Sequence, residues 1–71
     1  MKDQTYITCI YNEGGRQINF ERWTCKKVAT VNKNMKTLFS NNLYKACNRD
    51  ARYYITYDNN KNAVTDKIYV S

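Results

Sequence analysis

Apolar residues between Thr24 and Phe39 recur at the spacing of an α-helix. In the segment TCKKVATVNKNMKTLF they follow one another at steps of three, four, three and one, which places them on one face of a 3.6-residue helix. Thr24 is the predicted N-cap, because its hydroxyl can accept hydrogen bonds from free N–H groups of the first turn. The pattern ends at Ser40-Asn41-Asn42, so the sequence predicts an amphipathic helix over residues 24–39. Its apolar face consists of Val28, Val31, Met35, Leu38 and Phe39.

Four further segments combine period-two alternation with β-branched and aromatic residues, which is typical of strands. Apolar residues lie on both faces of the first segment, which indicates a central strand or an outer face that is not purely solvent. Asn12-Glu13-Gly14-Gly15 predicts a tight hairpin turn, because glycine tolerates positive φ. The asparagines of residues 59–62 predict a second turn. The strand segments are Gln4–Tyr11, Arg16–Trp23, Ala51–Asp58 and Ala63–Val70.

This order predicts one small α+β domain over residues 1–71. Its expected architecture is ββαββ: a four-stranded antiparallel sheet made of two hairpins, with one amphipathic helix packed on one face. Residues 43–50 either form a further helical turn or two, with Leu43, Ala46 and Cys47 packing on the core, or continue the first helix. If Tyr53, Ile55 and Tyr57 face the helix, the tyrosines that alternate with them are left on the outer face.

Composition favours a folded, basic chain. Among 71 residues, 42% are hydrophobic, seven are tyrosine and none is proline, which argues against disorder. The formal net charge is +6, and a positive field favours nucleic acid, an acidic protein face or anionic lipid. No acidic residue occurs between Glu21 and Asp50. Positive charge is therefore concentrated on and around the predicted helix.

Cations gather at the predicted start of the helix, in Arg22, Lys26 and Lys27, beside Thr24. Cations in a first turn are unfavourable to the helix dipole. Their presence is explained if an anion docks at the exposed N–H groups. The alternative is a solvated charge cluster that costs the helix about a few tenths of a kcal/mol.

A second candidate is the outer face of the sheet, where Tyr54 and Tyr69 would lie near Arg52 and Lys67. Aromatic rings beside cations can stack unpaired bases, although tyrosines also pack across strands in ordinary sheets. A third candidate is the polar face of the helix, which includes Lys33 and is either solvated or laid against a partner. Together these groups give the predicted partner-binding residues: Arg22, Lys26, Lys27, Lys33, Lys36, Arg52, Tyr54, Lys67 and Tyr69.

Catalytic chemistry has little support in the sequence. There is no histidine, no nucleophile-plus-base pattern and no phosphate loop, and the six carboxylates are scattered. We expect no enzyme, no cofactor and no metal site; a metal-independent ribonuclease using Lys, Arg and Tyr is the remaining enzymatic alternative. Cys9, Cys25 and Cys47 lack C-x-x-C spacing, so we expect reduced cysteines that fill core space in a cytoplasmic protein. Because no long apolar run occurs, we expect neither a signal peptide nor a membrane span.

In general style, the chain resembles the small single-domain proteins that bacteriophages and mobile elements encode against host defence, the anti-CRISPR proteins among them. The resemblance covers length, lack of catalytic groups, and richness in Asn, Lys, Tyr and Ile. It covers no alignable residues, so no family site is carried over. It implies an inhibitor, acting in the host cytoplasm, that occupies an acidic protein surface or a nucleic-acid-handling nucleoprotein complex of the host. We expect this inhibitor to bind through the positive helix face and tyrosines.

The alternative is a module that binds nucleic acid directly, mainly through phosphate contacts. Both functions are compatible with a monomer or with a homodimer, because a terminal strand can pair across a sheet edge. The two functions differ in whether the isolated protein binds nucleic acid.

Overall fold

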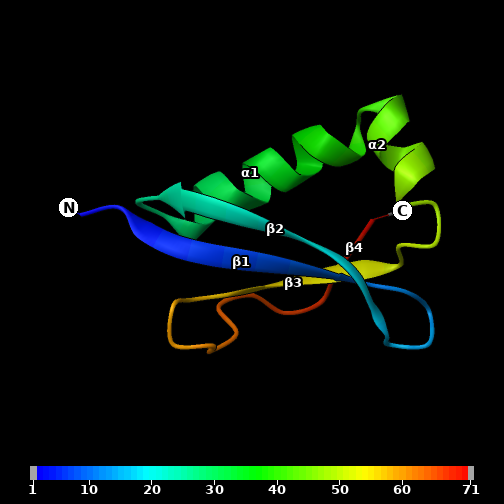
Figure 1. Ribbon diagram of the computed structural model, residues 1–71. Helices are drawn as coiled ribbons and strands as arrows, with labels where there is room; N and C mark the ends of the chain where they lie inside the picture. Colours follow the sequence, from blue (N-terminus) through cyan, green and yellow to red (C-terminus); the bar gives the residue numbers. More distant parts are fainter. Residues whose placement is uncertain (1, 71) are drawn as a thin grey trace.

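The computed structural model describes residues 2–70 and contains a four-stranded antiparallel sheet with two helices on one face (Figure 1). The strand order is β2-β1-β3-β4, so β1 and β3 are the central strands. The predicted sheet with a helix across one face is confirmed. A second, shorter helix follows the first, so the single-helix architecture is not confirmed, whereas the alternative of a further helical turn or two after the first helix is. The elements are β1 (Gln4–Tyr11), β2 (Gln17–Cys25), α1 (Val28–Phe39), α2 (Asn42–Cys47), β3 (Tyr53–Tyr57) and β4 (Ile68–Tyr69).

The first hairpin forms where the sequence predicts it. β1 has the predicted bounds and pairs antiparallel with β2. In the turn, the Gly15 N–H donates to the Asn12 carbonyl at 3.0 Å, and Gly15 has a φ of 83°. The Asn12 side chain also accepts from the Arg16 N–H at 2.9 Å. A register shift after Ile10 places a bulge in β2 beside the turn, which adds twist to this end of the hairpin.

The second hairpin is less regular than predicted. The predicted strand Ala63–Val70 reduces to an isolated bridge at Ala63 and the two residues of β4. One cause is that the Thr65 hydroxyl accepts a hydrogen bond from the Thr56 N–H at 3.1 Å. A side chain thereby occupies a place that a strand carbonyl would fill in a regular ladder. In the turn before it, the Asp58 carboxylate accepts from the N–H groups of two of the predicted turn asparagines.

Helix α1 begins later than predicted. Thr24 and Cys25 pair with Thr5 and Gln4 and belong to β2, so the predicted Thr24 N-cap is wrong. The N-cap is Lys27, whose side chain makes no capping hydrogen bond. The strand extends because both residues still have a partner on β1, and this pairing satisfies their backbone groups. The predicted apolar face of α1 is confirmed, with Val31 and Met35 fully buried and Val28, Leu38 and Phe39 packed around them.

Helix α2 is separate from α1. The Asn41 side chain accepts hydrogen bonds from the N–H groups of Leu43 at 2.9 Å and Tyr44 at 3.1 Å, which caps a new helix. The expectation that Leu43, Ala46 and Cys47 pack on the core is wrong, since all three are exposed and Leu43 is 79% exposed. Tyr44 packs inward instead, because α2 starts a new turn and the phase of the apolar pattern changes there.

The core lies between the sheet and α1. Its buried members come from both central strands and the helix: Tyr6, Ile10, Val31, Met35 and Tyr54. On the same face, the hydroxyls of Thr8 and Thr56 meet at 2.8 Å, which satisfies both polar groups away from water. Tyr54 is 2% exposed and its ring stacks on Phe39. Since side chains alternate along a strand, Tyr53, Ile55 and Tyr57 point away from the helices, opposite to the expected orientation.

The three cysteines are free thiols in three different environments. Cys25 packs against the core, as expected. Cys9 lies half-buried on the sheet face away from the helices, and Cys47 is exposed on α2, so neither fills the core. No helix in residues 2–70 has the length and apolar character needed to span a membrane.

Candidate binding surface

The sheet face opposite the helices, here called the open face, is largely apolar. The strand registers arrange its side chains in three rows across the sheet. One row joins Phe20, Cys9 and Ile55. The second row joins Arg22, Ile7 and Tyr57, and the third joins Tyr11, Tyr53 and Tyr69.

Tyrosine rings on the open face form a connected cluster. The rings of Tyr11 and Tyr53 stack with their centroids 5.1 Å apart, and Tyr69 lies against Tyr53 at 5.8 Å. The hydroxyls of Tyr11 and Tyr57 share a hydrogen bond of 2.9 Å. Lys67 places its Nζ 4.9 Å from the centre of the Tyr53 ring, in cation–π contact. These contacts hold the rings in place, so they lose little freedom on binding a partner.

Burial, followed by the hydrogen bond to Tyr57, raises the pKa of Tyr11 above its ordinary value. Burial also raises the pKa of the Cys9 thiol nearby. Both groups are therefore neutral at physiological pH, and the thiol is a weak nucleophile. The open face therefore offers neutral hydroxyls for hydrogen bonding.

Large apolar side chains remain accessible at the two edges of the open face. Phe20 on β2 is 55% exposed and Tyr69 on β4 is 57% exposed. Ile18, at the bulge of β2, is 38% exposed. The inner residues of the face are half-buried only by their neighbours, since both helices lie on the other side (Figure 1). A contiguous apolar face of this kind indicates an interaction surface.

Within the four strands, the only charged side chain on the open face is a cation. Within residues 2–70 the four strands contain one carboxylate, Glu21, and it points to the helix side, where it accepts a hydrogen bond from the Tyr44 hydroxyl at 3.0 Å. Arg22 is the next residue of β2 after Glu21, so its side chain points the other way and lies on the open face. Lys67, over the Tyr53 ring, adds a second positive charge. The open face thus combines apolar and aromatic side chains with cations.

The predicted partner-binding residues divide between the two sides of the molecule. Arg22, Lys67 and Tyr69 belong to the open face. Lys26 and Lys27 precede α1, and Lys33 and Lys36 are exposed on it, so these four lie on the helix side. Of the predicted cluster at the helix start, Lys26 and Lys27 lie directly before α1, but Arg22 and Thr24 belong to β2 and alternate with residues that face the helices.

Two further predicted residues have a different place from the expected one. The predicted exposure of Tyr54 is wrong, because this side chain is in the core and cannot contact a partner. Arg52 lies on the helix side, where it lines cavities with Ala51. Sequence reasoning missed the main residues of the open face, which are Tyr11, Phe20, Tyr53 and Ile55. The signal that could have found them was the apolar character of both faces of the first strand.

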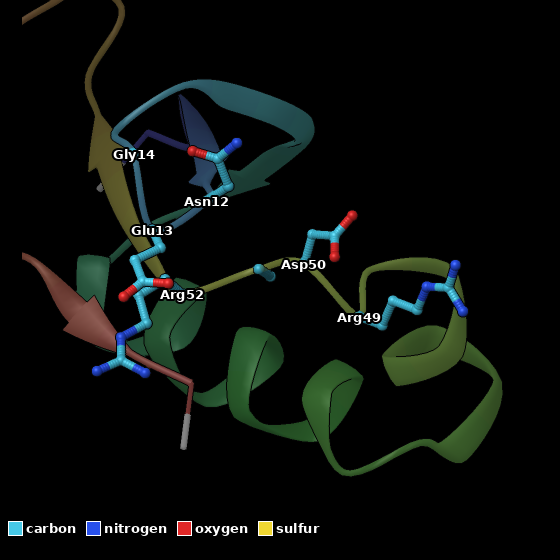
Figure 2. A pocket seen from close by; sticks show the side chains of 7 residues that line it. Asn12, Glu13, Gly14, Arg49, Asp50 and Arg52 are labelled. Carbon is cyan, nitrogen blue, oxygen red and sulfur yellow. The ribbon is translucent and has the colours of Figure 1, made fainter.

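One cavity, of about 370 Å³, lies between the first hairpin turn and the segment before β3. Figure 2 shows Arg49 and Arg52 on either side of Asp50 along this segment, with Glu13 coming from the turn. Two cations and two carboxylates line the cavity, so it has no strong preference for an anion or a cation. No group of three potential metal ligands occurs in the part of the chain that the structure describes.

Known proteins give no template for the open face or for the cationic side that carries the helices. Comparison with protein families, with curated proteins and with solved structures found no match to this chain. The function must therefore be argued from the chemistry of the open face and of the cationic helix side.

Proposed function

We propose that the protein is a non-enzymatic binding protein that attaches through its open face to a protein component of a nucleic-acid-handling complex of the host. The observation that supports this most is the apolar and aromatic open face with Arg22 and Lys67 as its cations. Tyrosine, phenylalanine and arginine are enriched at protein interfaces, and Tyr and Arg are frequent hot spots. The complementary surface is an apolar patch bordered by carboxylates.

The partner class follows from the resemblance to small phage-encoded inhibitors and from the net charge of +6. Proteins that handle nucleic acid work on a polyanion, and an inhibitor of such a complex must remain bound despite its phosphates. A basic inhibitor is attracted to that environment. We therefore assign an inhibitor of the anti-CRISPR type, acting in the host cytoplasm.

Direct stacking of bases on the open face is less well supported. The ring of Tyr53 is already in contact with Tyr11, Tyr69 and the Lys67 ammonium. The most exposed rings, Phe20 and Tyr69, lie on opposite edge strands, roughly 14 Å apart at three strand spacings. Adjacent free ring faces, which single-strand binding proteins use for successive bases, are therefore missing from this part of the structure.

The test is capture of the partner from nuclease-treated bacterial lysate with tagged protein, followed by mass spectrometry. The open-face variant Phe20→Thr/Arg22→Gln changes two solvent-facing residues of β2 and preserves strand propensity at position 20. The matched control, Lys26→Gln/Lys33→Gln, removes two charges from the helix side. Unfolding curves of all three proteins establish that each is folded before capture.

The wild type and the control should capture the same component of a nucleic-acid-handling complex, and the open-face variant should lose it. Nuclease treatment should not release the component, because the contact is between proteins. Capture that persists in the open-face variant would refute the assignment of the surface. Capture of no such component by the wild type would refute the assigned partner class.

A further inference from the structure

A second surface lies on the helix side, where the ends of α1 and α2 approach β4. Two adjoining cavities, of about 420 Å³ and about 250 Å³, share Phe39, Lys45 and Val70 in their linings. We call the two together the basic cleft. The larger cavity alone falls within the range of roughly 300–1,000 Å³ that is typical of small-molecule sites.

Four cations line the basic cleft, and none of the described residues that line it is acidic. Lys36 comes from α1, Lys45 from α2, and Arg49 and Arg52 from the segment between α2 and β3. All four side chains are exposed. Like charges gathered in one cleft repel each other, and a bound anion offsets that repulsion.

An aromatic ring is fixed beside these cations. Phe39 lines both cavities and is held by two neighbours: its ring stacks on Tyr54 at 5.8 Å and meets Tyr44 edge-on at 5.1 Å. Val70 adds aliphatic surface to the same floor. Asn48 also lines the cleft, but its side chain is occupied, because it accepts from Asn19 and donates to a main-chain carbonyl of α2. The cleft therefore combines an apolar floor with a cationic border.

We propose that the basic cleft binds a nucleoside phosphate, either a free nucleotide or one unit of a nucleic-acid strand. The phosphates lie at Lys45, Arg49 and Arg52, and the base lies against Phe39. Arginine guanidinium groups bind phosphate oxygens in a bidentate manner, and lysine adds a mobile point charge. An apolar wall next to a planar ring accommodates a base, whereas an inorganic anion needs neither the wall nor the ring.

The carboxylates of the neighbouring cavity, shown in Figure 2, should weaken the binding of an anion in the cleft. Arg49 and Arg52 line both cavities, and Glu13 and Asp50 line only the neighbouring one. These carboxylates lower the positive potential at the two guanidinium groups. Neutralising them with Glu13→Gln/Asp50→Asn should therefore strengthen nucleotide binding, by about threefold or more.

The test measures binding of a fluorescent adenine nucleotide and of a labelled 12-residue single strand by anisotropy, at low and at physiological salt. The cleft variant is Lys45→Gln/Arg49→Gln. Its matched control is Lys27→Gln/Lys33→Gln, which removes the same charge from residues that line neither cavity. Unlabelled adenosine triphosphate and inorganic triphosphate serve as competitors, which separates the base from the phosphates.

We expect at least tenfold weaker binding in the cleft variant and less than threefold in the control, with the nucleotide competing better than inorganic triphosphate. Binding of both probes identifies a free nucleotide as a sufficient ligand, whereas binding of the strand alone identifies a nucleic-acid chain; either result supports the cleft. Equal losses in the two variants would overturn the proposal, since binding would then follow net charge. If the nucleotide probe binds, equal competition by inorganic triphosphate would also overturn the proposal, and so would no binding of either probe.

This proposal is independent of the proposed function. The open-face variant Phe20→Thr/Arg22→Gln changes no residue of the cleft and should bind nucleotide as the wild type does. Partner capture and nucleotide binding can therefore fail separately.

Discussion

Two tyrosines that the sequence places together on the outer face have opposite environments, and the same substitution in each tests the orientation of the sheet. Tyr54 is 2% exposed, stacks on Phe39 and belongs to the core, whereas Tyr69 is 57% exposed at the edge of the open face. The variants are Tyr54→Ala and Tyr69→Ala. Because the chemical change is identical, the difference in unfolding free energy reports the different surroundings of the two rings.

The expected losses differ severalfold. Truncating a buried aromatic side chain costs about 3–5 kcal/mol, including the cavity it leaves. The stack of Tyr54 on Phe39, at 5.8 Å, contributes about 0.5–1.5 kcal/mol of this loss. A chain of 71 residues has a total stability of about 4–11 kcal/mol. Tyr54→Ala should therefore remove about a quarter or more of the stability, and all of it if the wild type lies at the lower end of this range.

Tyr69→Ala removes a side chain that is more than half exposed and whose main contact is Tyr53. We expect a loss of about 1 kcal/mol, which lowers Tm by roughly 4–8 °C in a domain of this size. Urea unfolding followed by circular dichroism measures both variants. Equal losses, or a larger loss for Tyr69→Ala, would show that the helices cover the other face of the sheet.

Three further changes test individual contacts. Thr8→Val leaves the buried Thr56 hydroxyl without its partner at 2.8 Å and should cost about 1–3 kcal/mol of stability. The double variant Thr8→Val/Thr56→Val should be nearly neutral, because no unpaired hydroxyl remains. A double-mutant cycle from urea unfolding measures both effects, and two neutral single variants would contradict the expected result. Asn41→Ala removes the cap of α2 and should lower stability by about 1 kcal/mol in the same assay, so an unchanged urea midpoint would refute the cap. Burial and the hydrogen bond to Glu21 raise the pKa of Tyr44. Below pH ~10 both the folded and the unfolded chain keep this proton; at higher pH the unfolded chain releases it first, so stability falls as pH rises. Tyr44→Phe should therefore lose stability less steeply than the wild type above pH ~10, and equal slopes in urea unfolding would contradict this.

Periodicity predicted the parts of the fold whose two faces differ in polarity. The apolar positions of α1 alternate with exposed Lys33 and Thr37, and the helix face was predicted correctly. The first turn was predicted because glycine tolerates the positive φ that such a turn requires. Gly15 has this conformation in the structure. The start of α1 was not predicted correctly, because Thr24 is equally suited to a helix cap and to a strand. Its pairing with β1 decides between these two roles.

The orientation of β3 was not predictable from its own sequence. Tyr53, Ile55 and Tyr57 are more apolar than the alternating Tyr54 and Thr56, so hydrophobicity favours the wrong face. The hydroxyl of Thr56 is tolerated in the core because Thr8 pairs with it across the sheet. That contact joins residues 48 positions apart, and it depends on a register that the sequence does not state.

The candidate site was predicted in composition but not in position. The concentration of cations around α1 is real, since Lys26, Lys27, Lys33 and Lys36 are exposed there. The sequence could not separate them from Arg22, because strand alternation turns Arg22 to the far side of the sheet. It could not show the basic cleft either, since its cations come from three separate segments.

The claim that the open face is the partner surface is tested most directly by methyl NMR of the protein with its captured partner. Ile7 and Ile55 lie on the open face, whereas Ile68 pairs with Tyr54 and packs against the core on the helix side. Addition of the partner should shift or broaden the methyl signals of Ile7 and Ile55 and leave that of Ile68 unchanged. A change confined to Ile68, with Ile7 and Ile55 unaffected, would place the partner on the helix side and contradict the account.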